Sequence, residues 1–300
     1  MNRSYQRIVP VRSHEAFTSV GMRQLGCVLT KATSVVISVH MYTFPAQGWP
    51  FSEKGGDRML REFTPLAAHR LDEFCQHQLE STGLIFPPVD AFQLAALLRF
   101  EVVFDVAHPQ RASCVTLRHG NGGQRLIVVR PEERVERLHW AVAHELGEFF
   151  AAEAIRTLGT PVDDVEPPHR EWLANQLARR LLVPSRPFFV DLQRLDGDLI
   201  ALKNRFSTAS YEVLARRMLD ATDPSVITIM DQGRITFRRS NVLERVPGLT
   251  AMEKVVWLRA HQTGLHQREE SESEQVQAWA IHEPGWKREI IRTTAAWMNW

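Results

Sequence analysis

The stretch His144-Glu145-Leu146-Gly147-Glu148 carries more information about fold and chemistry than any other part of this 300-residue chain. On an α-helix, residues i and i+4 lie on the same face, so the side chains of His144 and Glu148 can reach one metal ion. Glu145 lies beside them, where a general base would take a proton from water. The stretch differs by one residue from the pattern H-E-x-x-H, because Glu148 stands where a second histidine is expected.

The segment around this stretch is predicted to be a buried helix. Pro131 suits a first helical position, and the helix dipole favours the acidic Glu132 and Glu133 that follow. An apolar stripe recurs at spacings of three and four: Val135, Leu138, Val142, Leu146 and Phe149. The alternative for so short a pattern is a solvated helix face. Burial would be unfavourable for a histidine and two carboxylates without partners, and one metal ion would satisfy all three.

A second helix is expected to supply a third ligand. Pro167 and Pro168 end the preceding loop, and the following segment is a helix that Pro184 stops. Its apolar stripe is Leu173, Leu177 and Leu181, and another face holds Glu171, Ala174, Asn175 and Ala178. The small alanines would let this face approach the first helix closely. Glu171 would then complete a three-ligand catalytic site with an open fourth position. An ordinary amphipathic helix with an acidic first turn is the alternative.

These motifs resemble those of the ImmA/IrrE-type metallopeptidases of bacteria and their mobile elements. Residues 136–147 are similar to the family helix E-R-x-R-F-x-x-A-H-E-L-G-H, with departures at His139, Trp140 and Glu148. Residues 171–184 resemble its second helix, E-x-x-A-N-x-F-A-x-x-L-L-M-P, and residues 285–292 resemble the G-W-x-R-E-I-L-R ending of some longer members. The resemblance extends over about residues 85 to 295, including Pro87-Pro88-Val89-Asp90 and the helix that follows.

The resemblance implies a role for each matching residue. His144 and Glu171 would be metal ligands and Glu145 the general base, while the family's second histidine ligand falls on Glu148. A carboxylate can also bind a metal, but it makes the site more negative and weakens the ion's activation of water. Oxygen ligands also shift preference from Zn²⁺ towards Mn²⁺ or Fe²⁺. Three outcomes remain open: an active zinc enzyme, an enzyme that uses another metal, or a site without hydrolytic activity.

Two further histidines lie near the motifs. His139 points about 140° away from His144 around the helix, so a packed histidine is favoured over a ligand. His169 falls in the proline-bounded loop before Glu171. It could act as a substitute ligand or a proton donor, although loop histidines are usually solvated.

Composition indicates a soluble globular chain with room for two or three domains. Hydrophobic residues make up 44% and charged residues 24%, and the net charge of +1 gives no general argument for nucleic-acid binding. The three cysteines, Cys27, Cys75 and Cys114, are odd in number and widely spaced, so they indicate neither a disulfide framework nor a cysteine zinc site. This favours a reducing cytoplasm. No uninterrupted apolar run is long enough for a membrane helix.

The expected domain plan has four parts. Residues 1–58 form an N-terminal extension without an assigned function, with a strand at 33–44 and a linker at 47–57; helical pattern follows from 59 to 79. The zincin-like metallopeptidase domain covers residues 59–192. Residues 193–222 form a helix-turn-helix-like pair, in which Arg205, Arg216 and Arg217 would contact phosphates. The favoured alternative is a helical pair that packs on the peptidase core.

Residues 223–300 are expected to form a small α+β module. Strands at 226–230 and 234–238 would flank a hairpin turn at 231–233. A capping box at Thr250 opens a helix that ends at Gly264. Residues 268–275 are predicted to be an acidic loop, and strands at 277–281 and 289–293 complete the module.

Together these patterns predict an α+β protein: a helix-rich zincin-like peptidase domain with a smaller α+β C-terminal region. The resemblance to the ImmA/IrrE-type family implies metal-dependent cleavage of a helix-turn-helix transcriptional repressor, which would relieve repression under stress or during induction of a mobile element. Weak or no DNA binding and no membrane association are expected. The alternative is a non-catalytic regulator of the same fold that binds a repressor or DNA.

Overall fold

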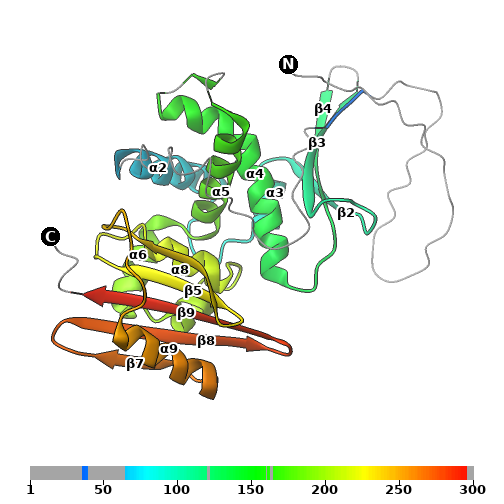
Figure 1. Ribbon diagram of the computed structural model, residues 1–300. Helices are drawn as coiled ribbons and strands as arrows, with labels where there is room; N and C mark the ends of the chain where they lie inside the picture. The colour runs from blue at the N-terminus through cyan, green and yellow to red at the C-terminus, as the bar shows by residue number, and fades with distance from the viewer. Residues whose placement is uncertain (1–35, 40–64, 120–121, 160, 163–164, 296–300) are drawn as a thin grey trace.

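The computed structural model describes residues 36–39, 65–119, 122–159, 161–162 and 165–295 (Figure 1). Two long helices, α4 (Val135–Thr157) and α5 (Pro167–Leu182), lie in the middle of the molecule, with a β-sheet on either side (Figure 1). Helix α2 (Pro65–Thr82) packs against α5, and α3 (Ala91–Leu97) packs against α4. This mixture of helices and sheets is consistent with the α+β class predicted from the sequence.

The first sheet has the strand order β1-β3-β4-β2. Its strands are β1 (Val36–Val39), β2 (Phe100–Phe104), β3 (Ala112–His119) and β4 (Gly122–Val129). The β1–β3 and β3–β4 pairs are antiparallel, whereas β2 runs parallel to β4. Strand β1 is the described part of the strand predicted at 33–44. The rest of the predicted N-terminal extension, its linker and the helical segment 59–64 lie outside the described residues.

Helix α4 begins later than predicted. Its N-cap is Arg134, so the expectation that Pro131 takes the first helical position is wrong. The backbone N–H of Arg130 still donates to the carbonyl of Arg111 (2.8 Å), and the chain needs the next residues to turn from the sheet into the helix. The predicted apolar stripe is confirmed in the centre of the helix, where Val142 and Leu146 are fully buried. At its ends, Val135 and Phe149 are exposed.

Helix α5 begins earlier than predicted: Pro167 and Pro168 lie in its first turn, whereas the sequence placed them at the end of a loop. Proline is tolerated there since the first N–H groups of a helix have no partner within it. The predicted close approach to α4 is confirmed at Gly147: a Cβ on this residue would lie 2.5 Å from the backbone oxygen of Ala174. Only glycine permits this contact, which brings Glu171, one turn earlier on α5, towards α4.

The pair α7 (Leu199–Arg205) and α8 (Tyr211–Met218) follows the short helix α6 (Ser185–Arg194). Arg216 and Arg217 are engaged within the fold, so the expectation that these two contact phosphates is wrong. Arg217 is fully buried and donates to Asp72 (2.8 Å), and Arg205 pairs with Asp191 (3.0 Å). The guanidinium of Arg216 lies 4.0 Å from the centre of the Phe237 ring. The side chains of α7 and α8 belong to the same hydrophobic core as α4 and α5, as the favoured alternative expected.

The second sheet has the order β6-β5-β9-β8-β7 and is antiparallel throughout. Its strands are β5 (Val226–Asp231), β6 (Arg234–Ser240), β7 (Gln267–Glu270), β8 (Glu274–Glu283) and β9 (Trp286–Ala295). The predicted hairpin is confirmed, as is the capping box that starts α9 (Ala251–Thr263). The predicted loop at 268–275 is wrong, because part of it is strand β7. Charged residues are common on an edge strand, where they prevent pairing with other chains, and they gave this segment the composition of a loop.

Candidate metal centre

Helices α4 and α5 bring the three predicted ligands together. His144 and Glu148 lie one turn apart on α4, with 4.0 Å between His144 Nε2 and Glu148 Oε1. Glu171 reaches across from α5, and its Oε2 lies 3.6 Å from the same nitrogen. One ligand atom from each residue lies within 4.8 Å of the other two, which makes the group a candidate to hold a metal ion. Their role as ligands stays a prediction.

Burial controls the charge of this group. Burial lowers the pKa of His144, so the imidazole is neutral, which is the form that binds metals. Burial and the neighbouring Glu171 raise the pKa of Glu148 to about 7. The pKa of Glu148 rises because two carboxylates, those of Glu148 and Glu171, lie close together in a poorly solvated site with too little positive charge to balance them. A divalent cation would supply the missing charge.

The residues present fit a metal ion. Glu148 Oε1 is buried and has no hydrogen-bond partner among the described residues. A buried polar atom without a partner is costly, so it usually marks a site for an ion or water. One imidazole and two carboxylates form a donor set that suits a divalent ion and leaves further coordination positions open.

Glu145 lies next to His144 but is not part of the ligand group. Its side chain is buried, and burial followed by the charge of Glu148 raises its pKa to about 8. The backbone of Cys114 on β3 forms a hydrogen bond with its carboxylate and lowers the pKa in part. The first sheet thus fixes Glu145 in place beside the ligands, where a general base is predicted.

Asn175 has a part in the site that the sequence did not assign. Its amide donates to Glu171 Oε1 (3.1 Å) and to the Glu171 carbonyl (2.9 Å). It therefore orients one of the candidate ligands, Glu171. The signal was present in the sequence, since Asn175 lies one helical turn after Glu171 on the same face.

The two additional histidines have other roles. His139 is buried and its Nδ1 accepts the backbone N–H of Ala91 (3.2 Å), which confirms that it is a packed histidine. His169 lies in the first turn of α5 instead of a loop. In the part of the chain that the structure describes, it belongs to no group of side chains able to hold a metal.

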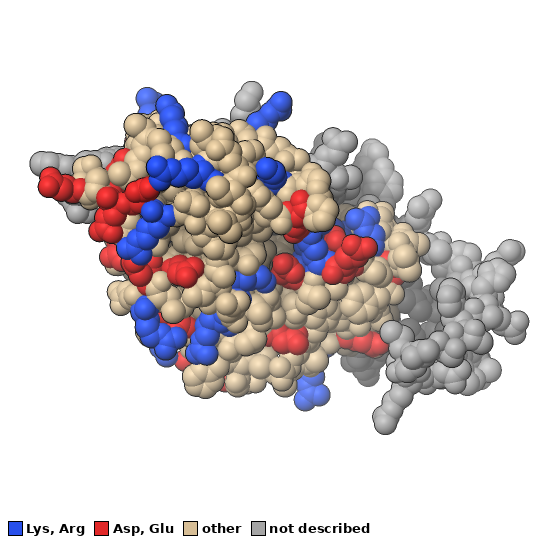
Figure 2. Space-filling view, turned by 90° about the horizontal axis from the view of Figure 1, so that it is seen from below, with Lys and Arg blue, Asp and Glu red and all other residues tan. Residues whose placement is uncertain are grey.

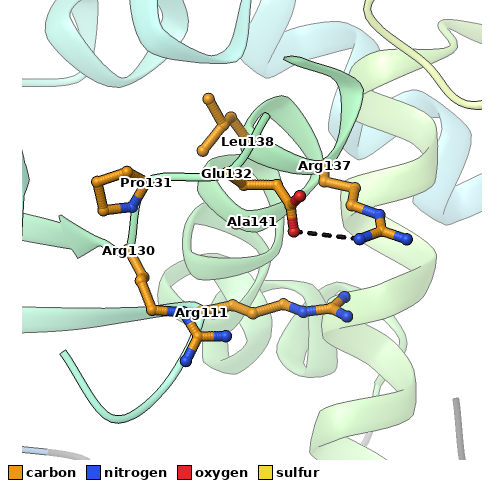
Figure 3. A pocket seen from close by; sticks show the side chains of 7 residues that line it. All are labelled: Arg111, Arg130, Pro131, Glu132, Arg137, Leu138 and Ala141. Atoms are coloured by element: carbon orange, nitrogen blue, oxygen red, sulfur yellow. Dashed lines mark hydrogen bonds and ion pairs between the residues drawn. The ribbon is translucent and has the colours of Figure 1, made fainter. Parts of the chain in front are cut away.

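A small pocket opens at the start of α4 and contains none of the candidate site residues (Figure 3). Arg111, Arg130 and Arg137 line it together with Glu132, which pairs with Arg137 at 3.1 Å. Burial and the neighbouring Arg137 lower the pKa of Arg111. The pocket adds no ligand to the centre, and its charged groups stabilise the turn that leads into α4.

Comparison with known proteins supports this description. Residues 104–219 match the family model Peptidase M78, described as the IrrE N-terminal-like domain, and this segment contains every candidate site residue. No curated protein matches the chain. A solved structure, a Mycobacterium tuberculosis transcriptional regulator, is similar with a TM-score of 0.61 and 20% identity over 81% of each chain. At that identity the likeness concerns the fold alone. The segment 104–219 is thus a domain of the ImmA/IrrE type, as the sequence motifs predicted.

Proposed function

We propose that this protein is a metal-dependent peptidase that cleaves a helix-turn-helix transcriptional repressor and so relieves repression. The observation that carries the proposal is the convergence of His144, Glu148 and Glu171 beside the buried Glu145, within a domain of a peptidase family. Stress or the induction of a mobile element would be the setting, and the cytoplasm the place of action.

The proposed chemistry divides between a metal ion and the chain. His144, Glu148 and Glu171 would hold Zn²⁺, with Mn²⁺ or Fe²⁺ as alternatives because two of the ligands are carboxylates. When bound, the ion supplies Lewis-acid activation of water and of the peptide carbonyl. Glu145 takes the proton on its carboxylate, and the burial that raises its pKa makes it a stronger base than a solvated glutamate. Asn175 keeps Glu171 in position.

A protein partner fits the surface better than DNA does. Figure 2 shows acidic and basic side chains interspersed on one face of the molecule, without a continuous basic area there. The net charge is +1, and Arg216 and Arg217 of α8 are engaged internally. At most weak, salt-sensitive and sequence-indifferent DNA binding follows from this. None of the helices in the described ranges has the length and apolarity needed to cross a membrane.

A non-catalytic regulator that binds a repressor or DNA is the second candidate. Glu148 favours it, because a carboxylate in place of a histidine weakens the activation of water. The similar structure that is named a transcriptional regulator fits either candidate.

Co-expression with helix-turn-helix repressors tests the proposal. The wild-type chain should cleave one of them, and Glu145→Gln should lower the rate by about 10²–10⁴-fold while its metal content stays unchanged. Glu153→Gln is the matched control, because Glu153 lies on the same helix but is exposed. Cleavage by Glu145→Gln at the wild-type rate would remove Glu145 from the mechanism. A wild-type chain that binds a repressor tightly and never cuts it would favour the regulator.

A further inference from the structure

The C-terminal module contains a second group of side chains able to hold a metal, which the sequence motifs did not indicate. The group consists of His261 on α9, His282 on β8 and Glu289 on β9. Helix α9 packs against the β7–β8–β9 side of the second sheet, so residues that are far apart in sequence meet there (Figure 1). The group is separate from the centre on α4 and α5 and uses none of its residues.

Glu289 is the focus of this group. Its side chain is fully buried, and its Oε1 lies 3.0 Å from His261 Nδ1 and 2.6 Å from His282 Nε2. The other oxygen, Oε2, accepts the indole N–H of Trp257 (3.1 Å). Both imidazoles therefore point at one carboxylate oxygen, while the tryptophan fixes the orientation of that carboxylate.

The arrangement has the chemistry of a metal site. Two imidazoles and one carboxylate are a common ligand set for Zn²⁺ and related transition-metal ions, with water at the remaining position. Ligand atoms that surround an ion at about 2.0–2.2 Å lie about 3 Å or slightly more from one another. One ligand atom from each of these three residues already lies within 4.8 Å of the other two. A hydrogen-bonded partner behind a ligand, here Trp257, is usual in such sites.

We propose that His261, His282 and Glu289 bind a divalent transition-metal ion, Zn²⁺ being the ion to test, and that this second ion joins α9 to strands β8 and β9. The imidazoles are partly accessible, with 28% and 20% of their side-chain surfaces exposed, so an ion can enter from solvent. The ion compensates the charge of the buried Glu289. This site does not depend on the peptidase activity.

A purely structural triad is the competing explanation, in which both rings donate N–H groups to the carboxylate. The double variant His261→Asn/His282→Gln distinguishes the metal site from the hydrogen-bonded triad. An asparagine amide can replace a histidine Nδ1–H donor and a glutamine amide an Nε2–H donor, but neither replaces imidazole as a metal ligand. Hydrogen bonds to Glu289 are kept, and metal binding is lost only if the rings are ligands.

The experiment is a titration of the metal-free full chain with Zn²⁺ in competition with a chromophoric chelator. The wild-type chain should bind two equivalents, and the His261→Asn/His282→Gln variant one. In a His144→Ala background, the chain should bind one equivalent, and the triple variant none. His266→Asn is the control, because His266 is an exposed histidine of the same module and its replacement should leave the number of bound Zn²⁺ equivalents unchanged. Trp257→Phe should weaken the second site by about 10–100-fold.

Each outcome decides the matter. The proposal is overturned if the His261→Asn/His282→Gln variant binds as much Zn²⁺ as the wild-type chain. A wild-type chain that binds one equivalent, lost in this variant, would support the second site and remove the metal from the centre on α4 and α5. Circular dichroism of each variant shows whether it has folded. If the double variant does not fold, the number of Zn²⁺ equivalents bound by the single variant His282→Gln provides a milder test.

Discussion

The candidate metal centre and the cluster around Asp72 both bury charged side chains, but they treat the charge differently. In the Asp72 cluster, Arg180 on α5 and Arg217 on α8 have no exposed side-chain surface, and both contact Asp72. Around α4 and α5, the carboxylates of Glu148 and Glu171 lie against each other and against His144. Charge that is compensated within the chain stabilises the fold. Charge that is left uncompensated marks the place where the chain needs an ion.

The largest stability effect is expected in the compensated region. Asp72→Ala removes a carboxylate that contacts two buried guanidinium groups, Arg180 Nε at 2.9 Å and Arg217 Nη2 at 2.8 Å. The loss should lower the free energy of unfolding by about 3–5 kcal/mol, because Asp220 is then the only carboxylate that the described contacts place against these two buried charges. Urea denaturation measures it, with the exposed neighbour Glu73→Ala as the control. A loss below about 1 kcal/mol would mean that this network is not the compensated structure we describe.

The uncompensated region should respond to pH in the metal-free protein. The pKa values of Glu148 and Glu145 are raised to about 7 and about 8, so folding favours their protonated forms. An acid with a raised pKa contributes stability at low pH that is lost as the pH rises through that value. Between pH 5 and pH 8 the free energy of unfolding of the wild-type chain should therefore fall by about 2–4 kcal/mol more than that of the Glu145→Gln variant.

Urea denaturation in the presence of a chelator at pH 5 and pH 8 measures this difference. Saturating Zn²⁺ should abolish much of it, because the ion stabilises the ionised carboxylates. If wild type and Glu145→Gln change in parallel with pH, the charge at this site is compensated in a way that the contacts do not reveal.

A smaller effect is expected from exchanging the unusual ligand. Glu148→His removes one negative charge and provides the imidazole of the family pattern, so Zn²⁺ affinity at this site should rise by about tenfold. A competition titration in the His261→Asn/His282→Gln background measures this site alone. Lower affinity would mean that the site is built around the glutamate, and an unchanged affinity would mean that position 148 does not face the ion.

The sequence predicted the parts of the fold that depend on local patterns. The i, i+4 spacing placed His144 and Glu148 together, the small face of α5 predicted its close approach to α4, and the capping box located α9. It failed where tertiary contacts decide the outcome. The arginines of α8 had the composition of a DNA-binding helix, and only the fold shows that Asp72, more than a hundred residues earlier, engages Arg217.

The group of His261, His282 and Glu289 could not be predicted from the sequence for the same reason. Its residues are spread over one helix and two strands, without a characteristic spacing, and only the pairing of β8 with β9 under α9 brings His282 and Glu289 to His261. Asn175 was placed on the correct face, but its bond to Glu171 depends on a side-chain orientation that the pattern does not specify.

The central claim is that His144, Glu148 and Glu171 hold one catalytic metal ion. Metal analysis of the purified full chain in the His261→Asn/His282→Gln background tests it most directly, because only the centre on α4 and α5 then remains. We predict one equivalent of metal in that chain, none after the further change Glu171→Ala, and one in the control Glu166→Ala, whose side chain is exposed. A chain without stoichiometric metal, or one that keeps its metal after Glu171→Ala, would contradict the claim.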